Sequence, residues 1–322
     1  MYFVYFIIFV MEFTHLHGHS TFSFLEAIWT PKKLVAKAKE LWFKAIWLTD
    51  LSAMYGAVQL YENCRDNDLN PIIGTELWFV LNLTWYNKIE DIWNICFLAK
   101  NTAWYQNLMK IVSVANQEWI AWKPKIDMET LWKYSDWVIA FMGGVDSWIW
   151  KMIYRSESDD KILEIFHMLQ DSLWKENVFF EIVAQDESKN EILRKINHKI
   201  LDFANGESVK IMTWNIYNYI EKTDKETWEL ALAIKDWKKM YDTDRRKPIW
   251  DFYLMTGDEI NEILLWNGYN QDGISAWMNT NNEIASQVKI DILMHQSLFP
   301  IYQTPKDVQE LYDSIKDSLI TE

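Results

Sequence analysis

The sequence has few of the features that identify several classes of protein. Its only two cysteines, Cys64 and Cys96, do not form a CxxC spacing, which argues against a disulfide framework and favours a reducing, cytoplasmic compartment. Basic residues are also in deficit, because 32 Lys and Arg stand against 46 Asp and Glu, giving a net charge of −14. Phosphate binding requires clustered Lys and Arg, so the chain is not expected to hold DNA by itself.

The N-terminus lacks the parts of a targeting or membrane segment. Residues 1–10 are almost wholly apolar, but a bilayer span takes about 20 residues. They carry neither the basic region nor the small-residue cleavage site of a signal peptide. We therefore expect no membrane contact, and a non-native N-terminal extension over residues 1–11, with Met11 as the natural start.

Glycine is scarce, whereas tryptophan is abundant. The chain has 9 Gly and 20 Trp, although average usage would give about 22 glycines. Trp42 follows a predicted helix at the position where helices favour a left-handed glycine. One explanation is translation with the wrong genetic code, in which UGA codons that specify glycine are read as Trp. The other is a truly Trp-rich protein. We favour the first, and do not use the aromatic content to argue for base stacking.

Three of the six histidines alternate within five residues, as His15, His17 and His19. On a β-strand these side chains would point to one face, and imidazole is the commonest metal ligand. The motif therefore suggests a metal site, although a strand of partly buried histidines without an ion explains it as well.

The segments that follow this motif make a recognisable series. In order, they are Ser23–Ala27, Ala45–Asp50, Met54–Val58, Pro71–Glu76, Leu98–Asn101, Tyr105–Leu108, Lys123–Asp127, Asp251–Leu254 and Phe299-Pro300. The series resembles the PHP (polymerase and histidinol phosphatase) domain that opens the alpha subunit of bacterial DNA polymerase III. The resemblance covers nearly the whole chain from about residue 12. It also places Trp29, Trp104, Trp119 and Trp237 at family glycine positions, whereas Trp228, inside a helical run, can be genuine.

Strands alternate with helices along most of the chain, which predicts βα units and a mainly parallel sheet. Strands are expected at 12–24, 44–49, 70–80, 92–99, 138–142, 178–183 and 209–213, and helices at 31–41, 55–67, 102–117, 159–172 and 187–205. Further helices are expected at 225–234, 257–266, 279–289 and 308–319. The resemblance implies an α/β fold, a distorted seven-stranded β/α barrel with its metal site at the carboxyl ends of the strands. We expect the barrel at 12–220, a helical appendix packed on it at 221–300, and the start of a linker to a polymerase core at 301–322.

The resemblance also allows the metal site to be carried over position by position. Five residues match or tolerably replace family ligands, namely His17, His19, Glu26, Asp50 and Glu76. Six others stand where ligands are lost, namely Leu51, Asn94, Gly144, Gln185, Asn215 and Tyr217. Leu and Gly cannot ligate, and neutral amides are weak ligands. This predicts one weakly held divalent ion (Zn, Mn or Mg) or none, and no catalytic residues. Ordinary polar residues at strand ends remain an alternative for Asp50 and Glu76.

Two functions from different classes remain open. The first is the N-terminal PHP region of a replicative polymerase alpha subunit, degenerate as an enzyme and acting as a structural and docking domain. Its partners would be the remainder of that subunit and a proofreading exonuclease subunit, with DNA contacted only through the full-length polymerase. The alternative is a free-standing metal-dependent PHP phosphoesterase or 3′→5′ exonuclease. A pure replisome scaffold would differ from the first only in lacking the polymerase.

Overall fold

The computed structural model describes residues 12–81, 92–117, 124–134, 138–141, 144–145, 147–294 and 304–319. The chain divides into two compact units, Met1–Asp291 and Ile292–Glu322. The expected N-terminal extension at residues 1–11, as well as Trp119 and the segment Phe299-Pro300, lie outside the described residues.

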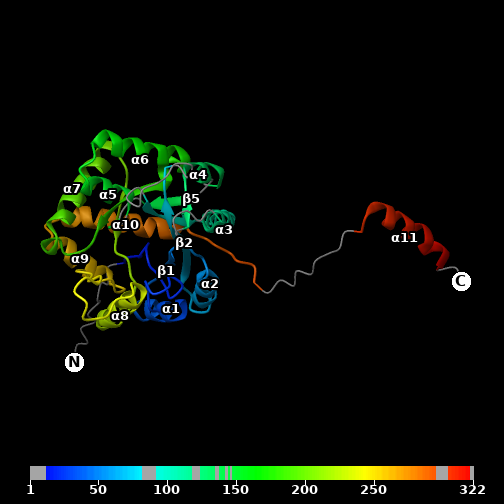
Figure 1. Ribbon diagram of the computed structural model, residues 1–322, viewed down its shortest axis with the longest axis horizontal. Coiled ribbons are helices and arrows are strands. Elements are labelled where there is room, and N and C mark those ends of the chain that lie inside the picture. The colour runs from blue at the N-terminus through cyan, green and yellow to red at the C-terminus, as the bar shows by residue number, and fades with distance from the viewer. Residues whose placement is uncertain are drawn as a thin grey trace, which may run out of the picture. The chain divides into compact units, whose positions relative to one another are not determined.

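The first unit is built around a curled sheet of seven described strands (Figure 1). Its path runs β1 (Ala45–Leu48), β2 (Asn70–Phe79), β3 (Trp93–Ala99), β5 (Val138–Phe141), β6 (Val178–Val183) and β7 (Ile211–Trp214), while β4 (Lys125–Ile126) pairs with β2 off this path. The α/β barrel-like architecture expected from the sequence is thereby confirmed.

The sheet is less parallel than the alternation of elements predicted. The pairs β1–β2, β2–β4, β5–β6 and β6–β7 are parallel, but β3 runs antiparallel to both β2 and β5. A parallel return requires a crossover of a dozen or more residues, usually a helix. The sequence predicts no helix between β2 and β3, which agrees with their antiparallel pairing.

The first predicted strand, at 12–24, is not a strand. Only an isolated bridge between Gly18 and Tyr217 forms there, and Thr49 N–H donates to the Gly18 carbonyl over 2.8 Å. Gly18 therefore lies between the ends of β1 and β7. A Cβ at this position would come within 2.0 Å of the Tyr217 ring, so the close approach requires glycine. Residues 15–20, which we call the histidine segment, thus bridge the two edges of the curled sheet.

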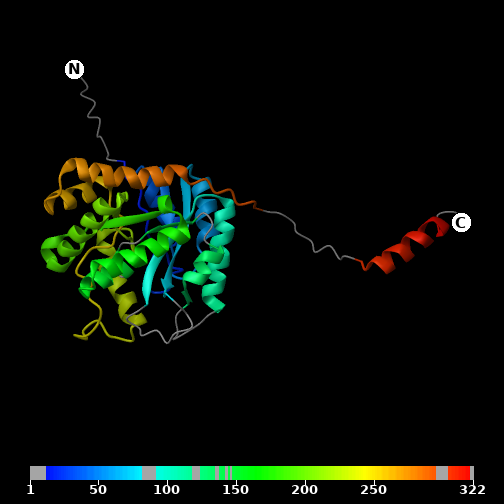
Figure 2. The ribbon, with the colours of Figure 1, turned by 90° about the horizontal axis from the view of Figure 1, so that it is seen from above.

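Helices cover the outside of the sheet (Figure 2). They are α1 (Pro31–Glu40), α2 (Ala57–Arg65), α3 (Thr102–Gln117), α4 (Met128–Tyr134), α5 (Trp148–Tyr154), α6 (Asp159–Leu173), α7 (Glu191–Glu207), α8 (Lys225–Lys235), α9 (Gly257–Trp266) and α10 (Gln271–Gln287), with short 3₁₀ turns at Lys175–Asn177, Glu187–Lys189 and Lys222–Asp224. The helix α10 begins eight residues before the expected 279, because the Asn270 side chain caps it by accepting from Gly273 N–H. The Asn281 side chain then ties α10 to β7 through both backbone groups of Thr213.

The second unit contains the helix α11 (Lys306–Leu319). Its apolar residues Val308, Leu311, Tyr312 and Ile315 recur at helical spacing and are all exposed.

Three tryptophans occupy backbone conformations that favour glycine. Trp42 (φ 60°) and Trp237 (φ 55°) each lie two residues after the last residue of a helix, directly behind its C-cap, and the hydrogen bonds around both form the same helix-ending motif. Trp174 has φ 71° and ψ 132°, a region that is strained for any residue with a Cβ. Trp42 and Trp237 are 84% and 96% exposed, so no packing of the indole compensates the strain.

Candidate metal centre

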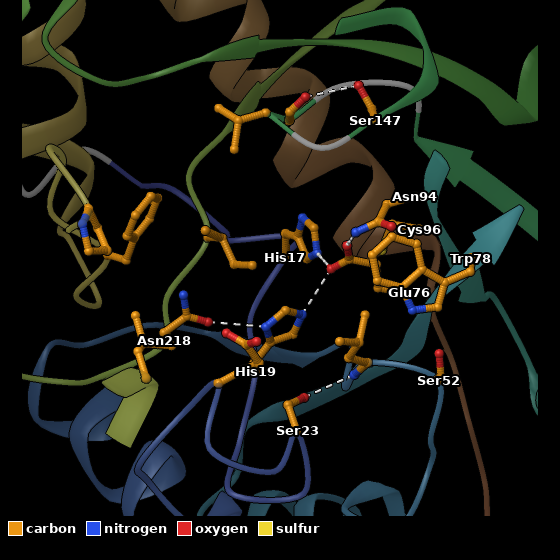
Figure 3. Close-up of a pocket in the computed structure, with 18 of the residues that line it drawn as sticks. His17, His19, Ser23, Ser52, Glu76, Trp78, Asn94, Cys96, Ser147 and Asn218 are labelled. Atoms are coloured by element: carbon orange, nitrogen blue, oxygen red, sulfur yellow. Dashed lines mark hydrogen bonds and ion pairs between the residues drawn. The ribbon is translucent and has the colours of Figure 1, made fainter. Parts of the chain in front are cut away.

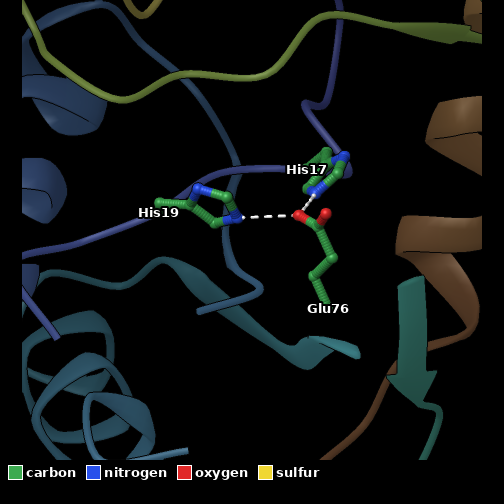
Figure 4. Close-up of side chains that lie close together, drawn as sticks. All are labelled: His17, His19 and Glu76. Atoms are coloured by element: carbon green, nitrogen blue, oxygen red, sulfur yellow. Dashed lines mark hydrogen bonds and ion pairs between the residues drawn. The ribbon is translucent and has the colours of Figure 1, made fainter. Parts of the chain in front are cut away.

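Three of the expected ligands meet at one end of the sheet. Nε2 of His17 lies 2.8 Å from Oε2 of Glu76, and Nε2 of His19 lies 2.9 Å from the same oxygen (Figure 4). All three side chains are buried, and one ligand atom from each lies within 4.8 Å of the others. The two imidazole rings stand edge to face with centroids 5.4 Å apart.

The backbone explains why these side chains converge. Side chains alternate between the two faces of a strand, so Glu76 and Trp78 on β2 share a face with their β3 partners Cys96 and Asn94. The histidine segment crosses this end of the sheet at Gly18. Asn94 Nδ2 in turn donates a hydrogen bond to Oε1 of Glu76, so the carboxylate is held from two sides.

The hydrogen-bond partners of the imidazoles fix their protonation. Trp214 Nε1–H donates to Nδ1 of His17 over 2.6 Å, so His17 carries its proton on Nε2 and is neutral. Burial lowers the pKa of His17 accordingly. In His19, Nδ1 lies 3.1 Å from Oδ1 of Asn218 while Nε2 faces Glu76, which makes both nitrogens donors. Burial opposes this charge, but the hydrogen bond and charge of Glu76 outweigh burial and raise the pKa of His19.

Glu76 is ionised in this arrangement. Burial by itself would raise the pKa of its carboxyl group, yet the hydrogen bonds from His17 and His19 and the positive charge of His19 hold that pKa well below its usual range. A buried carboxylate between two imidazoles is therefore ready to act as a ligand once the histidine Nε2 protons leave.

Asp50 and Glu26, the other two expected ligands, are occupied elsewhere. Asp50 accepts hydrogen bonds from the backbone and hydroxyl of Ser20 and from the hydroxyl of Ser23, at 2.7 to 2.8 Å. It therefore holds the turn after the histidine segment in place. Glu26 pairs with Lys235 at 2.7 Å and with Arg246 at 3.2 Å. Neither belongs to the group formed by His17, His19 and Glu76.

His15, the first histidine of the motif, points away from this group. Its two ring nitrogens lie 3.1 and 2.6 Å from the backbone carbonyls of Asn215 and Met255. The i, i+2, i+4 geometry of a strand does not apply here, because the segment is irregular.

At the positions where the sequence predicted lost ligands, three side chains form other hydrogen bonds and three line the pocket. Gln185 Nε2 donates to Oδ1 of Asn215 over 2.8 Å, and the Tyr217 hydroxyl donates to the backbone carbonyl of Trp47. Leu51, Asn94 and Gly144 line the same pocket as the histidines. Sequence reasoning missed Trp214, Asn218 and Cys96 as neighbours of the centre. Only the alternation along β3 pointed to Cys96, because it lies two residues after Asn94.

The pocket above these residues has a volume of about 1050 Å³ (Figure 3). Its wall includes Glu76, Asn94 and Cys96 from β2 and β3, and its rim carries Lys235 and Arg246. The donor set of two imidazoles and one carboxylate suits one divalent transition metal ion. Within the described residues, His17, His19 and Glu76 form the one such group.

Comparison with known proteins agrees with this geometry. A family model described as PHP domain matches residues 15–185. The chain belongs to the PHP domain family. This match spans both histidines, Glu76 and the strands β1 to β6.

The PHP chain is also similar to longer curated proteins. It is 25% identical over 307 residues to the DNA polymerase III subunit alpha of Borreliella burgdorferi, covering 93% of this chain and 26% of that protein. It is 29% identical over 266 residues to the protein of the same name from Deinococcus radiodurans, covering 79% of this chain and 20% of that one. The chain thus spans about a quarter of the length of these relatives. Among solved structures, an amidohydrolase from Chromobacterium violaceum with bound sulfate and no metal aligns with a TM-score of 0.42 at 12% identity, covering 64% of this chain and 87% of that chain.

Within the described residues, this PHP chain has no helix that is both long and apolar enough to cross a membrane.

Proposed function

We propose that the chain is the N-terminal PHP region of a replicative DNA polymerase III alpha subunit. In this proposal it binds a single divalent ion and acts as a structural and docking domain in the cytoplasm, not as a phosphoesterase. The similarity to polymerase alpha subunits over about nine tenths of the chain supports the context. The one three-residue ligand group found in the described part of the chain carries the rest of the proposal.

Phosphodiester hydrolysis of the two-metal kind needs two ions held close together, one to generate hydroxide and one to stabilise the leaving oxygen. His17, His19 and Glu76 would hold one ion, which when bound could polarise a water or a phosphoryl oxygen. For a second ion, Asp50 would have to give up its bonds to Ser20 and Ser23. Gln185 and Asn215 offer only neutral amides, which already bond to each other.

The competing phosphoesterase function can be tested directly. The full chain should be assayed with single-stranded DNA and with p-nitrophenyl phosphate, in Mn²⁺ and in Zn²⁺, beside a His17→Ala/His19→Ala double variant. We expect both proteins to hydrolyse neither substrate above background. Metal-dependent hydrolysis by the parent chain that disappears in the double variant would establish the phosphoesterase instead.

The polymerase context is tested at the level of the gene. We propose that the barrel ends near residue 220, that 221–300 pack on it, and that 301–322 lead toward a polymerase core. Sequencing beyond the codon for Glu322 should find an open reading frame with polymerase palm carboxylates. A stop codon at that point would refute the polymerase context and leave a free-standing PHP domain. In the same setting, a proofreading exonuclease subunit is the proposed docking partner, to be tested by co-purification with the full-length polymerase.

We propose further that many of the tryptophans are glycines in the natural protein, encoded by UGA codons. The left-handed Trp42 and Trp237, and the strained Trp174, support this. So do the indole N–H groups of Trp47, Trp93, Trp150 and Trp250, which are buried without a hydrogen-bond partner in the described part of the chain. A buried indole normally finds a partner, and an unsatisfied donor costs about 1–3 kcal/mol.

Mass spectrometry of the protein from its source organism tests this proposal. Peptides that cover positions 42, 174 and 237 should carry the mass of glycine. Peptides with Trp at these three positions would refute it.

A further inference from the structure

We propose that Cys96 supplies a thiolate as a fourth ligand, so that His17, His19, Glu76 and Cys96 together form a closed, structural zinc site. This inference rests on the single-ion centre proposed above and names its missing ligand. A zinc ion with four protein ligands keeps no open position for water or substrate. Such a site would therefore be structural and not catalytic.

The pairing of β2 with β3 places Cys96 beside Glu76. Glu76 and Cys96 are direct partners across this antiparallel pair. Side chains of such partners project from the same face of the sheet, with Cβ atoms about 4.5–5.5 Å apart. Cys96 accordingly lines the same pocket as His17 and His19, and Figure 3 shows it beside Glu76 and Asn94.

Asn94 holds the carboxylate of Glu76 from the same strand as Cys96. Asn94 precedes Cys96 by two residues on the same face of β3 and is 9% exposed. Its Nδ2 donates to Glu76, but its Oδ1 is buried without a hydrogen-bond partner among the described residues. Buried carbonyl oxygens are rarely left unsatisfied. Asn94 and Cys96 thus lie on the same face of the sheet as Glu76.

The donor set also selects the metal. Two imidazole nitrogens, one carboxylate oxygen and one thiolate are typical of zinc, whereas Mg²⁺ and Mn²⁺ prefer oxygen ligands. The Cys96 thiol is buried and reduced, and its side chain is hydrogen-bonded to Thr49. The Cys96 sulfur lies outside the compact group of the other three ligand atoms. Zinc binding therefore requires the Cys96 side chain to rotate away from Thr49, while its thiol proton passes to solvent.

The test uses the full chain, from which metal is first removed with a chelator and which is then reloaded with zinc or with Co²⁺. Zinc content is measured by mass spectrometry, and X-ray absorption reports the ligands of the bound zinc. We expect one zinc per chain with one sulfur at about 2.3 Å and the remaining ligands at about 2.0–2.2 Å. The Co²⁺ form should show a thiolate charge-transfer band in the near ultraviolet.

Cysteine variants provide the matched comparison. Cys96→Ser should lose the Co²⁺ charge-transfer band and bind zinc at least about tenfold more weakly. Cys64→Ser removes the other buried thiol, which lies in α2, and should keep the band and the affinity. The absorption measurement on the unaltered chain remains decisive if Cys96→Ser does not fold.

Three results would overturn the inference, and they can be told apart. One zinc with only nitrogen and oxygen ligands would remove Cys96 from the site but leave the single-ion centre intact. Failure to retain stoichiometric zinc would reject both the fourth ligand and the single-ion centre. Two or more ions per chain would reject the closed site and restore the phosphoesterase alternative.

Discussion

The two halves of this end of the sheet handle polar side chains in opposite ways. On the side built by the histidine segment and β2, ionisable groups remain close together, with His17 and His19 both facing Glu76. On the side built after β6 and β7, the neutral amides of Gln185 and Asn215 bond to each other. The carboxylate of the first half requires a positive charge beside it, whereas the two amides of the second half carry no charge that needs a partner. We therefore propose that metal ligands have been lost from the second half only. Substitutions in the two halves should have very different effects on stability and zinc binding.

Removing the carboxylate should have the largest effect. Glu76→Ala removes the carboxylate that bonds to the protonated, buried His19 and leaves it only the smaller electrostatic contributions of Asp50 and Glu26. Removal of one partner of a buried ion pair typically costs about 3–5 kcal/mol. We expect the free energy of unfolding in chelator to fall by that amount, and zinc binding to be lost. Urea unfolding and zinc titration measure the two quantities, with exposed Glu164→Ala, on α6, as the control. A loss below about 1 kcal/mol would mean that the pair is not charged.

The neutral half should respond more weakly. Gln185→Leu removes the donor to Asn215 and to the backbone carbonyl of Asp251. An acceptor left unsatisfied costs about 1–3 kcal/mol, so we expect a stability loss in that range without any change in zinc affinity. If zinc affinity fell as well, Gln185 would belong to the metal centre and the contrast between the halves would be wrong.

The sequence predicted the surviving half better than the altered half. The order of β1, α2 and β2 and the position of Glu76 followed from apolar runs and from the resemblance of the motifs. The hydrogen bonds of Asp50 to Ser20 and Ser23 did not, because a carboxylate at the end of a strand can hold either an ion or a turn. The irregular backbone at Gly18 was also missed, since alternating histidines mimic the period of a strand. The His15 side chain points away from the metal centre because its ring nitrogens contact the backbone carbonyls of Asn215 and Met255, about 200 and 240 residues away in sequence.

Tryptophan positions offer a third test, one that lies away from both halves. Trp42→Gly and Trp237→Gly each remove a Cβ from a left-handed residue, where the strain costs about 1–2 kcal/mol. We expect each variant to unfold at higher urea concentration than the parent. The matched control is Trp228→Gly, because the Trp228 indole is buried in α8 and donates to the Glu26 carbonyl. That variant should lose stability, and equal behaviour of all three would contradict the glycine proposal.

The smallest expected effect is the pH dependence contributed by His19. Its pKa in the folded chain is raised above the unfolded value of about 6.5. Its stabilising contribution is therefore fully present below pH of about 6.5 and is lost as pH rises through the folded pKa. His17, whose pKa is lowered, acts in the opposite direction, so the His19 contribution must be isolated as the difference between the parent and His19→Gln. We would measure this difference in chelator from pH 5.5 to 9, about the range in which His19 titrates. It should shrink as pH rises. For each unit by which folding raises the pKa of His19, the decrease should be less than about 1.4 kcal/mol. A difference that grew with pH would show that His19 is neutral in the folded chain and that Glu76 has one imidazole fewer to neutralise it.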